Sequence, residues 1–218
     1  MRRDRLRPAL ALAVHLCLFA FAAVPLSALL FFPERPDDGI RYEVFRYYTT
    51  LSNVLAGLAA PPAAVCALRG LRTGTYRLPP FLAGWRYMAT AMLTLTMMTV
   101  LFFLGPLFGY GAMFSRAYFW FHLVNPLLSI AAYCFLERDP AMRRSAVLLG
   151  VLPTALYGVV YVRETVFVGA DAGGWPDFYG FNIGGHWPLA IAAMLGTNLL
   201  LSFLVLLLHN RMGKRGKE

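Results

Sequence analysis

The sequence predicts an all-α integral membrane protein, a polytopic bundle of six transmembrane helices with both termini in the cytoplasm. Of its 218 residues, 59% are hydrophobic and only 14% are charged. An average soluble domain has roughly 45–50% apolar and about 25% charged residues. The apolar residues form long runs, and basic residues cluster between those runs. A single transmembrane domain over residues 1–218 therefore accounts for the whole chain.

Six apolar segments are long enough to span a hydrocarbon core as helices. None alternates in the way a membrane β-strand does, and backbone groups in lipid need partners within their own segment. The first segment follows several arginines and resembles a signal peptide, but it continues to Phe32, so we expect it to remain as a helix. The segments run over about residues 8–32, 44–68, 87–108, 117–137, 144–168 and 186–210.

The charge distribution predicts the orientation of the bundle. With a cytoplasmic N-terminus, 15 of the 20 Lys and Arg residues fall on the inner side and seven of the 11 acids on the outer side. This bias is the positive-inside pattern of a multi-pass protein of a cell membrane. The net charge of +9 sits in short clusters between apolar runs, so we expect no nucleic-acid partner.

Polar residues inside the predicted helices gather near the outer side. Thr49 and His122 each lie five residues inside the outer end of their segments, roughly 7–8 Å deep at 1.5 Å per residue. Intramembrane polar groups are costly, which makes such positions candidate functional sites. The other candidates at this level are Arg46 and Asn53 on the second segment, Asn125 on the fourth, and Tyr161 and Glu164 on the fifth.

These residue types predict nucleophilic attack on a lipid ester that arrives sideways from the bilayer. His122 would take the proton of the Thr49 hydroxyl, and Asn53 or Asn125 would donate to the oxyanion. The structural alternatives are a threonine bonded back to its own helix, and histidine and asparagine side chains that bridge helices. Arg46 and Glu164 are expected to pair with each other or with lipid headgroups.

Other functions have weaker support in the sequence. A metal site of His122 with His186 lacks ligand spacing, so no metal or organic cofactor is expected. A small transporter needs a polar path through both leaflets, whereas the second and fourth segments turn apolar below Asn53 and Ser129. A non-enzymatic lipid-binding protein remains open.

The sequence also predicts the surroundings of one outer loop and of two further histidines. The outer loop over residues 169–185 is either an interfacial aromatic belt or a cap over the site. His209 is expected to be solvated or to contact headgroups. His15 lies on the opposite side of the membrane from His122.

Three short motifs resemble a known family. Residues 45–55 (FRYYTTLSNVL) look like the aromatic-Thr-x-x-Ser-Asn signature of bacterial Pr6Pr-type membrane proteins, which are similar to the androgen-induced and androgen-dependent membrane hydrolases of animals. Residues 121–128 (FHLVNPLL) and 174–178 (GWPDF) resemble two further motifs of that family. The resemblance implies hydrolysis of fatty acid esters of hydroxy fatty acids in a bacterial inner membrane, with Thr49 as nucleophile and His122 as its partner. Because Thr50 follows directly, the register of the nucleophile is open by one residue.

Overall fold

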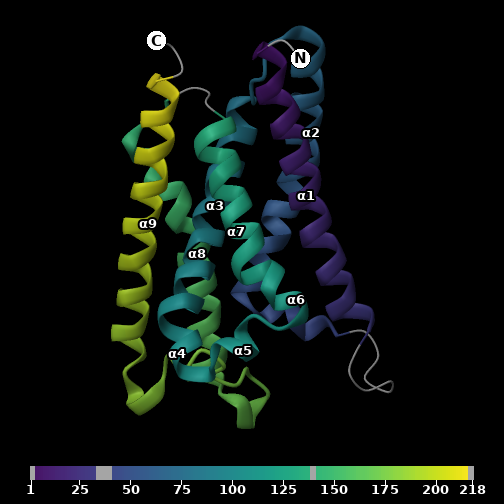
Figure 1. Cartoon of the computed structure of the whole chain (residues 1–218). Helices are drawn as coiled ribbons and strands as arrows, with labels where there is room; N and C mark the ends of the chain where they lie inside the picture. Colours follow the sequence, from purple (N-terminus) through teal and green to yellow (C-terminus); the bar gives the residue numbers. More distant parts are fainter. Residues whose placement is uncertain (1–2, 33–40, 138–140, 216–218) are drawn as a thin grey trace.

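The computed structural model describes residues 3–32, 41–137 and 141–215, and in these residues it confirms the all-α six-helix bundle (Figure 1). Six helices of the described residues are long and apolar enough to cross a membrane. Five of them match the predicted segments to within a few residues. Their bounds are Arg5–Phe31, Tyr48–Thr73, Pro80–Phe108, Arg116–Leu136, Arg144–Val168 and Trp187–Gly213.

The third helix begins earlier than predicted, at Pro80 rather than near residue 87. Pro80 occupies the first turn, where its missing N–H would have no partner in any case. Arg86, which we had placed in the inner connection, therefore lies inside the helix and is fully buried. The predicted start of this helix was wrong because a charged residue was taken as part of the loop, whereas Arg86 is buried and paired with Glu137.

Three of the spans are continuous α-helices, and three are divided by short π- or 3-10 turns. The continuous ones are α1 (Arg3–Phe31), α2 (Tyr48–Thr73) and α9 (Trp187–Arg215). The third span is α3 (Pro80–Thr99), η3 (Val100–Leu104) and α4 (Gly105–Phe108). The fourth is α6 (Arg116–Phe119), η4 (Trp120–Val124), α7 (Asn125–Ala131) and η5 (Ala132–Leu136), and the fifth is η6 (Arg144–Ala146), α8 (Val147–Val162) and η7 (Arg163–Val168).

Two of the π-turns have the same local cause. Each ends two residues before a proline, Pro106 after η3 and Pro126 after η4. A proline cannot donate to the carbonyl four residues earlier, and the backbone widens to restore a partner. In η4 the N–H of Asn125 accordingly bonds the carbonyl of Trp120, five residues back. The widened turn contains His122.

Between the spans lie short elements and loops at the two ends of the bundle. The outer side carries η2 (Tyr42–Arg46), α5 (Tyr110–Met113), η8 (Ala170–Ala172) and η9 (Ile183–Gly185). The start of α1 and the end of α9 both lie at the opposite end, on different sides of the bundle (Figure 1). We call that end the inner end, following the orientation that the charges predict.

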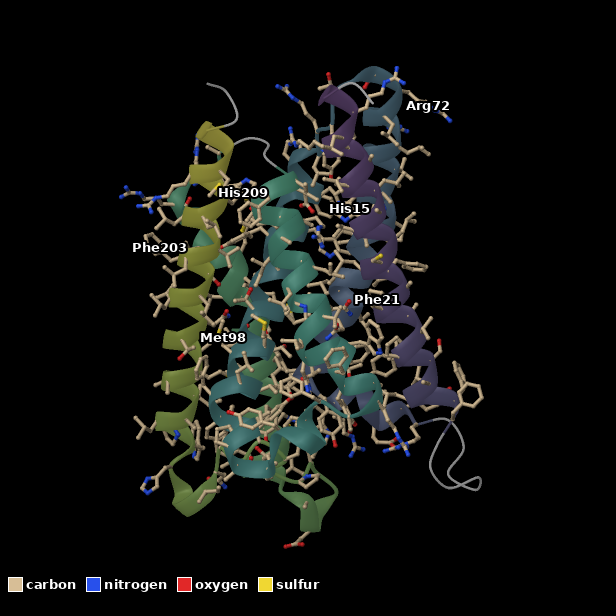
Figure 2. All side chains as sticks on the ribbon, in the orientation of Figure 1. His15, Phe21, Arg72, Met98, Phe203 and His209 are labelled. Atoms are coloured by element: carbon tan, nitrogen blue, oxygen red, sulfur yellow. The ribbon has the colours of Figure 1, made fainter. Side chains whose placement is uncertain are left out.

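Small residues set how closely the helices approach. A Cβ on Gly57 of α2 would lie 2.8 Å from the Ala22 Cβ of α1, and one on Gly150 of α8 would lie 2.6 Å from Ser202 Oγ of α9. In lipid, such close contacts replace the hydrophobic force that packs soluble helices. The exposed apolar side chains, Phe203 of α9 among them, point outward around the bundle (Figure 2).

Candidate functional site

Thr49 lies in the first turn of α2, in the wall of a small cavity near the outer end. The cavity has a volume of about 30 Å³ and is also lined by Tyr48, Thr96 of α3 and Tyr157 of α8. Thr50 is 3% exposed and does not line this cavity. The geometry thus favours Thr49 over Thr50 as the hydroxyl that a ligand can reach.

A larger groove adjoins this cavity. It has a volume of about 470 Å³ and runs between α3, the outer loop and α9. Leu95, Thr99, Phe181 and Met194 line both spaces, so the groove leads directly to the wall that contains Thr49. His186 also lines the groove. The remaining lining is predominantly apolar and of a size that suits an acyl chain.

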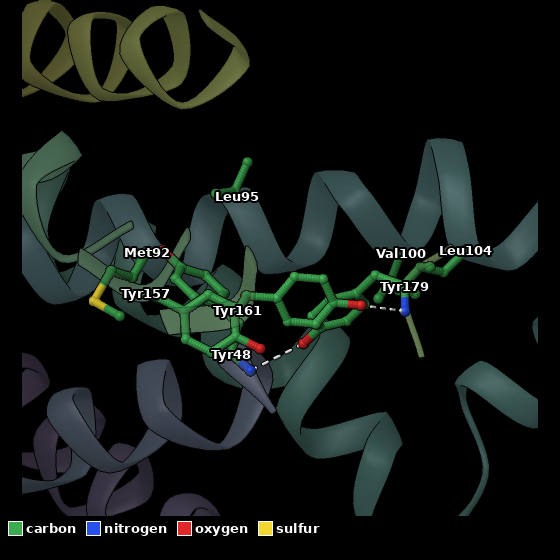
Figure 3. Close-up of a cluster of buried hydrophobic side chains, with 8 residues drawn as sticks. All are labelled: Tyr48, Met92, Leu95, Val100, Leu104, Tyr157, Tyr161 and Tyr179. Atoms are coloured by element: carbon green, nitrogen blue, oxygen red, sulfur yellow. Dashed lines mark hydrogen bonds between the residues drawn. The ribbon is translucent and has the colours of Figure 1, made fainter. Parts of the chain in front are cut away.

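The outer loop covers the site, as the cap alternative predicted. Tyr179 reaches in from the loop, and its hydroxyl accepts a hydrogen bond of 2.9 Å from the backbone N–H of Tyr48 at the start of α2 (Figure 3). The side chain of the N-cap residue, Tyr47, makes no capping hydrogen bond. Tyr179, from a distant segment, therefore supplies the acceptor for a backbone N–H at the start of α2. Burial raises the pKa of the Tyr179 phenol to about 12.

Tyr161 and Asp177 hold this loop in place. The Tyr161 hydroxyl accepts from the backbone N–H of Tyr179 at 3.0 Å (Figure 3) and donates to Asp177 Oδ1 at 2.6 Å. The two carboxylate oxygens of Asp177 also accept from the backbone N–H groups of Phe181 and Asn182. Tyr161, predicted as a supporting residue, is 1% exposed and supports the cap rather than the chemistry.

His122 is buried at the same end of the bundle. Its Nδ1–H donates to the carbonyl of Met113 at 2.6 Å, which leaves Nε2 as the ring atom able to accept a proton. The ring stacks on Tyr118, with centroids 5.5 Å apart. Among the described residues, no hydrogen bond joins the Thr49 hydroxyl to His122, and His122 does not line the Thr49 cavity.

The two asparagines connect helices, and their donors are occupied. Asn53 Nδ2 donates to the carbonyls of Thr49 (2.9 Å) and Phe121 (3.2 Å). These bonds place the backbone at Thr49 of α2 and the backbone next to His122 of the fourth span at the same depth in the bundle. Asn125 Nδ2 donates to Asn53 Oδ1 (2.7 Å) and to the carbonyl of Phe21 (3.0 Å). An amide has two N–H donors. The expectation that Asn53 or Asn125 donates to an oxyanion is therefore wrong for this arrangement.

The expected ion pair between Arg46 and Glu164 is absent from the described residues. Glu164 pairs with its neighbour Arg163, and the Arg46 side chain is exposed. Arg46 contributes only its carbonyl, which accepts from the Tyr157 hydroxyl at 2.8 Å. Within the described chain, no group of three or more His, Cys, Asp or Glu side chains is placed to hold a metal ion.

A second polar cluster, which the sequence argument missed, lies in the inner half. Arg86 Nε bonds both carboxylate oxygens of Glu137, at 3.0 and 3.3 Å, and both side chains are buried. His15 Nε2 lies 3.4 Å from Glu137 Oε1 and 3.0 Å from the Tyr76 hydroxyl. The inner half therefore contains buried polar groups, contributed by α1, α3 and the ends of the connecting segments rather than by α2.

A sequence signal for this cluster existed on the third helix. Arg86, Thr90 and Thr94 recur every four residues and form one buried polar stripe. Thr90 continues the stripe to the fourth span through a 2.8 Å hydrogen bond with Ser129. The predicted third segment began at residue 87 and so left Arg86 out of this stripe.

His209 also differs from its expected place. It is 2% exposed, its Nδ1–H donates to the carbonyl of Tyr133 at 2.8 Å, and its ring stacks on the Tyr133 ring. His15 and His209 both lie in the half of the bundle that carries the termini (Figure 2). His209 therefore joins α9 to the fourth span instead of facing headgroups.

Comparison of the chain with protein-family models, with curated proteins and with solved structures gives no match.

Proposed function

We propose that the chain hydrolyses lipid esters in the outer half of the bilayer, with Thr49 as the nucleophile and His122 as the general base. The observation that carries this proposal is that Thr49 lines the small cavity that shares Leu95, Thr99, Phe181 and Met194 with the apolar groove. An acyl chain in the groove would bring its ester to this hydroxyl. Fatty acid esters of hydroxy fatty acids, which the family resemblance implies, are substrates of this class.

The proposed reaction has two halves. Thr49 Oγ1 attacks the ester carbonyl while its proton passes to His122 Nε2, and that proton then goes to the departing alcohol. Water, deprotonated by the same histidine, releases the acid from the acyl-threonine. Because the Thr49 and His122 side chains share no hydrogen bond in the free protein, a bridging water or a rotamer change on substrate binding completes the pair.

The start of α2 replaces the two asparagines as the source of oxyanion stabilisation. Thr49 lies in the first turn of a 26-residue helix, where backbone N–H groups have no partner within the helix. The N–H of Tyr48 already donates to Tyr179, so the oxyanion would use the N–H groups that follow it in this turn. The positive end of the helix dipole also favours negative charge there. In this proposal Asn53 and Asn125 fix the relative positions of the helices that carry Thr49 and His122.

A second candidate is a lipid-binding protein without catalytic activity. The occupied donors of Asn53 and Asn125, and the absence of a direct Thr49–His122 hydrogen bond in the described chain, favour it. Both candidates use the same groove, so a binding measurement and an activity measurement together separate them.

The test combines labelling with turnover on the purified, detergent-solubilised chain. A fluorophosphonate probe and a fatty acid ester of a hydroxy fatty acid are offered to wild type, Thr49→Ala, His122→Ala and the matched control Thr50→Ala. We expect Thr49→Ala to abolish labelling and Thr50→Ala to keep it, and His122→Ala to lower turnover by about 10²–10⁴-fold. Binding of a fluorescent fatty acid without labelling or turnover in wild type would support the lipid-binding candidate instead.

A further inference from the structure

Two apolar grooves in the inner half lie on either side of an aromatic pair on α3. One groove, of about 390 Å³, is lined by α2 from Pro62 to Arg69 and by the start of α3. The other, of about 410 Å³, is lined by Leu55, by α3 and by Leu149 of α8. Phe81 and Trp85 line both grooves.

The aromatic pair forms a fixed ridge between the grooves. Trp85 Nε1 donates to the carbonyl of Leu55 on α2 at 3.2 Å, which holds its ring against the bundle. The ring of Phe81 contacts it edge-on, with centroids 6.0 Å apart, and Phe81 is 80% exposed. The Phe81–Trp85 ridge therefore lies between the two grooves.

A positive charge stands at the inner end of one groove. Arg69 lines the 390 Å³ groove and lies four residues before the end of α2, roughly 6 Å from it at 1.5 Å per residue. No Asp or Glu occurs between residues 44 and 136, and in the described parts of the chain no carboxylate pairs with Arg69. An arginine at this depth attracts the phosphate of an anionic lipid.

We propose that these grooves bind one anionic diacyl phospholipid of the inner leaflet. Each groove takes one acyl chain, the Phe81–Trp85 ridge lies between the chains, and the phosphate pairs with Arg69. The charge of Arg69 selects an anionic headgroup, and the two apolar spaces of similar volume select two chains. Neither groove is lined by Thr49 or His122, and the site does not depend on the proposed hydrolysis.

The test is native mass spectrometry of the full chain with phosphatidylglycerol and phosphatidylcholine of identical acyl chains. We expect wild type to retain phosphatidylglycerol about fivefold more strongly, the ratio that corresponds to about 1 kcal/mol per arginine near a lipid surface. Arg69→Gln should remove this preference. Arg72→Gln, at the same end of α2 but outside the groove lining, is the matched control and should keep it.

A further variant tests the chain-binding part separately. Phe81→Ala shortens the ridge at an exposed position, so it should lower retention of both lipids while the preference between them stays. Equal retention of the two lipids by wild type would overturn the proposal. So would equal losses in Arg69→Gln and Arg72→Gln, because that result indicates diffuse attraction to the inner end rather than a site.

Discussion

Removing the charge of Glu137 should strongly destabilise the inner half of the bundle. Glu137 is the carboxylate that neutralises Arg86, and the two side chains are 3% and 0% exposed as residues. Glu137→Gln leaves the guanidinium buried without its counter-ion. Breaking a buried pair in this way costs about 3–5 kcal/mol, whereas the intact pair contributes much less than that.

The magnitude can be measured as a thermal transition of the detergent-solubilised protein. For a chain of about this length, 1 kcal/mol corresponds to about 2–4 °C, so Glu137→Gln should lower Tm by about 10 °C. Arg86→Gln should have the smaller effect, because a buried carboxyl left without its arginine can take up a proton and become neutral, whereas a buried guanidinium cannot lose its charge.

The double variant Arg86→Gln, Glu137→Gln separates a charge effect from a shape effect. With both charges gone, no uncompensated ion remains, so its Tm should lie well above that of Glu137→Gln alone. A Tm loss in the double variant as large as the sum of the two single losses would refute the reasoning. So would a Tm change below about 3 °C, or about 1 kcal/mol, in Glu137→Gln.

Three further predictions concern packing, the cap and a surface carboxylate. Gly150→Ala should destabilise the fold by about 1–3 kcal/mol, since the added Cβ would lie 2.6 Å from a side-chain oxygen of α9. The control Gly196→Ala adds its Cβ to open space and should leave the Tm unchanged, and equal Tm values for the two variants would contradict this packing. Tyr179→Phe should cost about 1–2 kcal/mol as the start of α2 loses its partner. The pKa of Tyr179 is raised to about 12 in the fold, so its contribution to the stability of the protein is complete below pH 10 and is lost as the pH rises toward 12. The Tm of wild type should therefore fall more steeply than that of Tyr179→Phe in this range, and equal slopes would contradict the prediction. The hydrogen bond from Arg41 lowers the pKa of Glu43, so Arg41→Gln should raise that pKa in an NMR titration, and an unchanged value would contradict the pairing.

The sequence was sufficient for the number, type and approximate bounds of the helices, because apolar length is the dominant constraint in a bilayer. It was also sufficient to place Thr49 and His122 at the same end of the bundle. Apolarity failed at the start of α3, where Arg86 is buried against Glu137. A buried ion pair and a loop charge have the same appearance in a hydropathy profile.

The hydrogen-bond partners of the buried side chains could not be predicted from the sequence. Helical spacing placed Asn53 and Asn125 beside the proposed catalytic pair, but only the fold shows where their N–H groups donate. Those of Asn53 donate to the carbonyls of Thr49 and Phe121, and those of Asn125 donate to the carbonyl of Phe21 and to Asn53 Oδ1. All of these partners except Thr49 lie 68 to 104 residues away along the chain. Likewise, no local pattern reveals that Tyr179 serves the start of α2 across 131 residues.

The Tyr179 contact has a consequence for how a substrate reaches Thr49. Entry from the aqueous phase would lift the outer loop and strip the start of α2 of its hydrogen-bond partner, whereas entry from the bilayer along the groove leaves that partner in place. The sideways route is therefore the one that keeps the helix intact. For the proposed hydrolysis, this arrangement would favour esters that are already dissolved in the membrane over water-soluble esters.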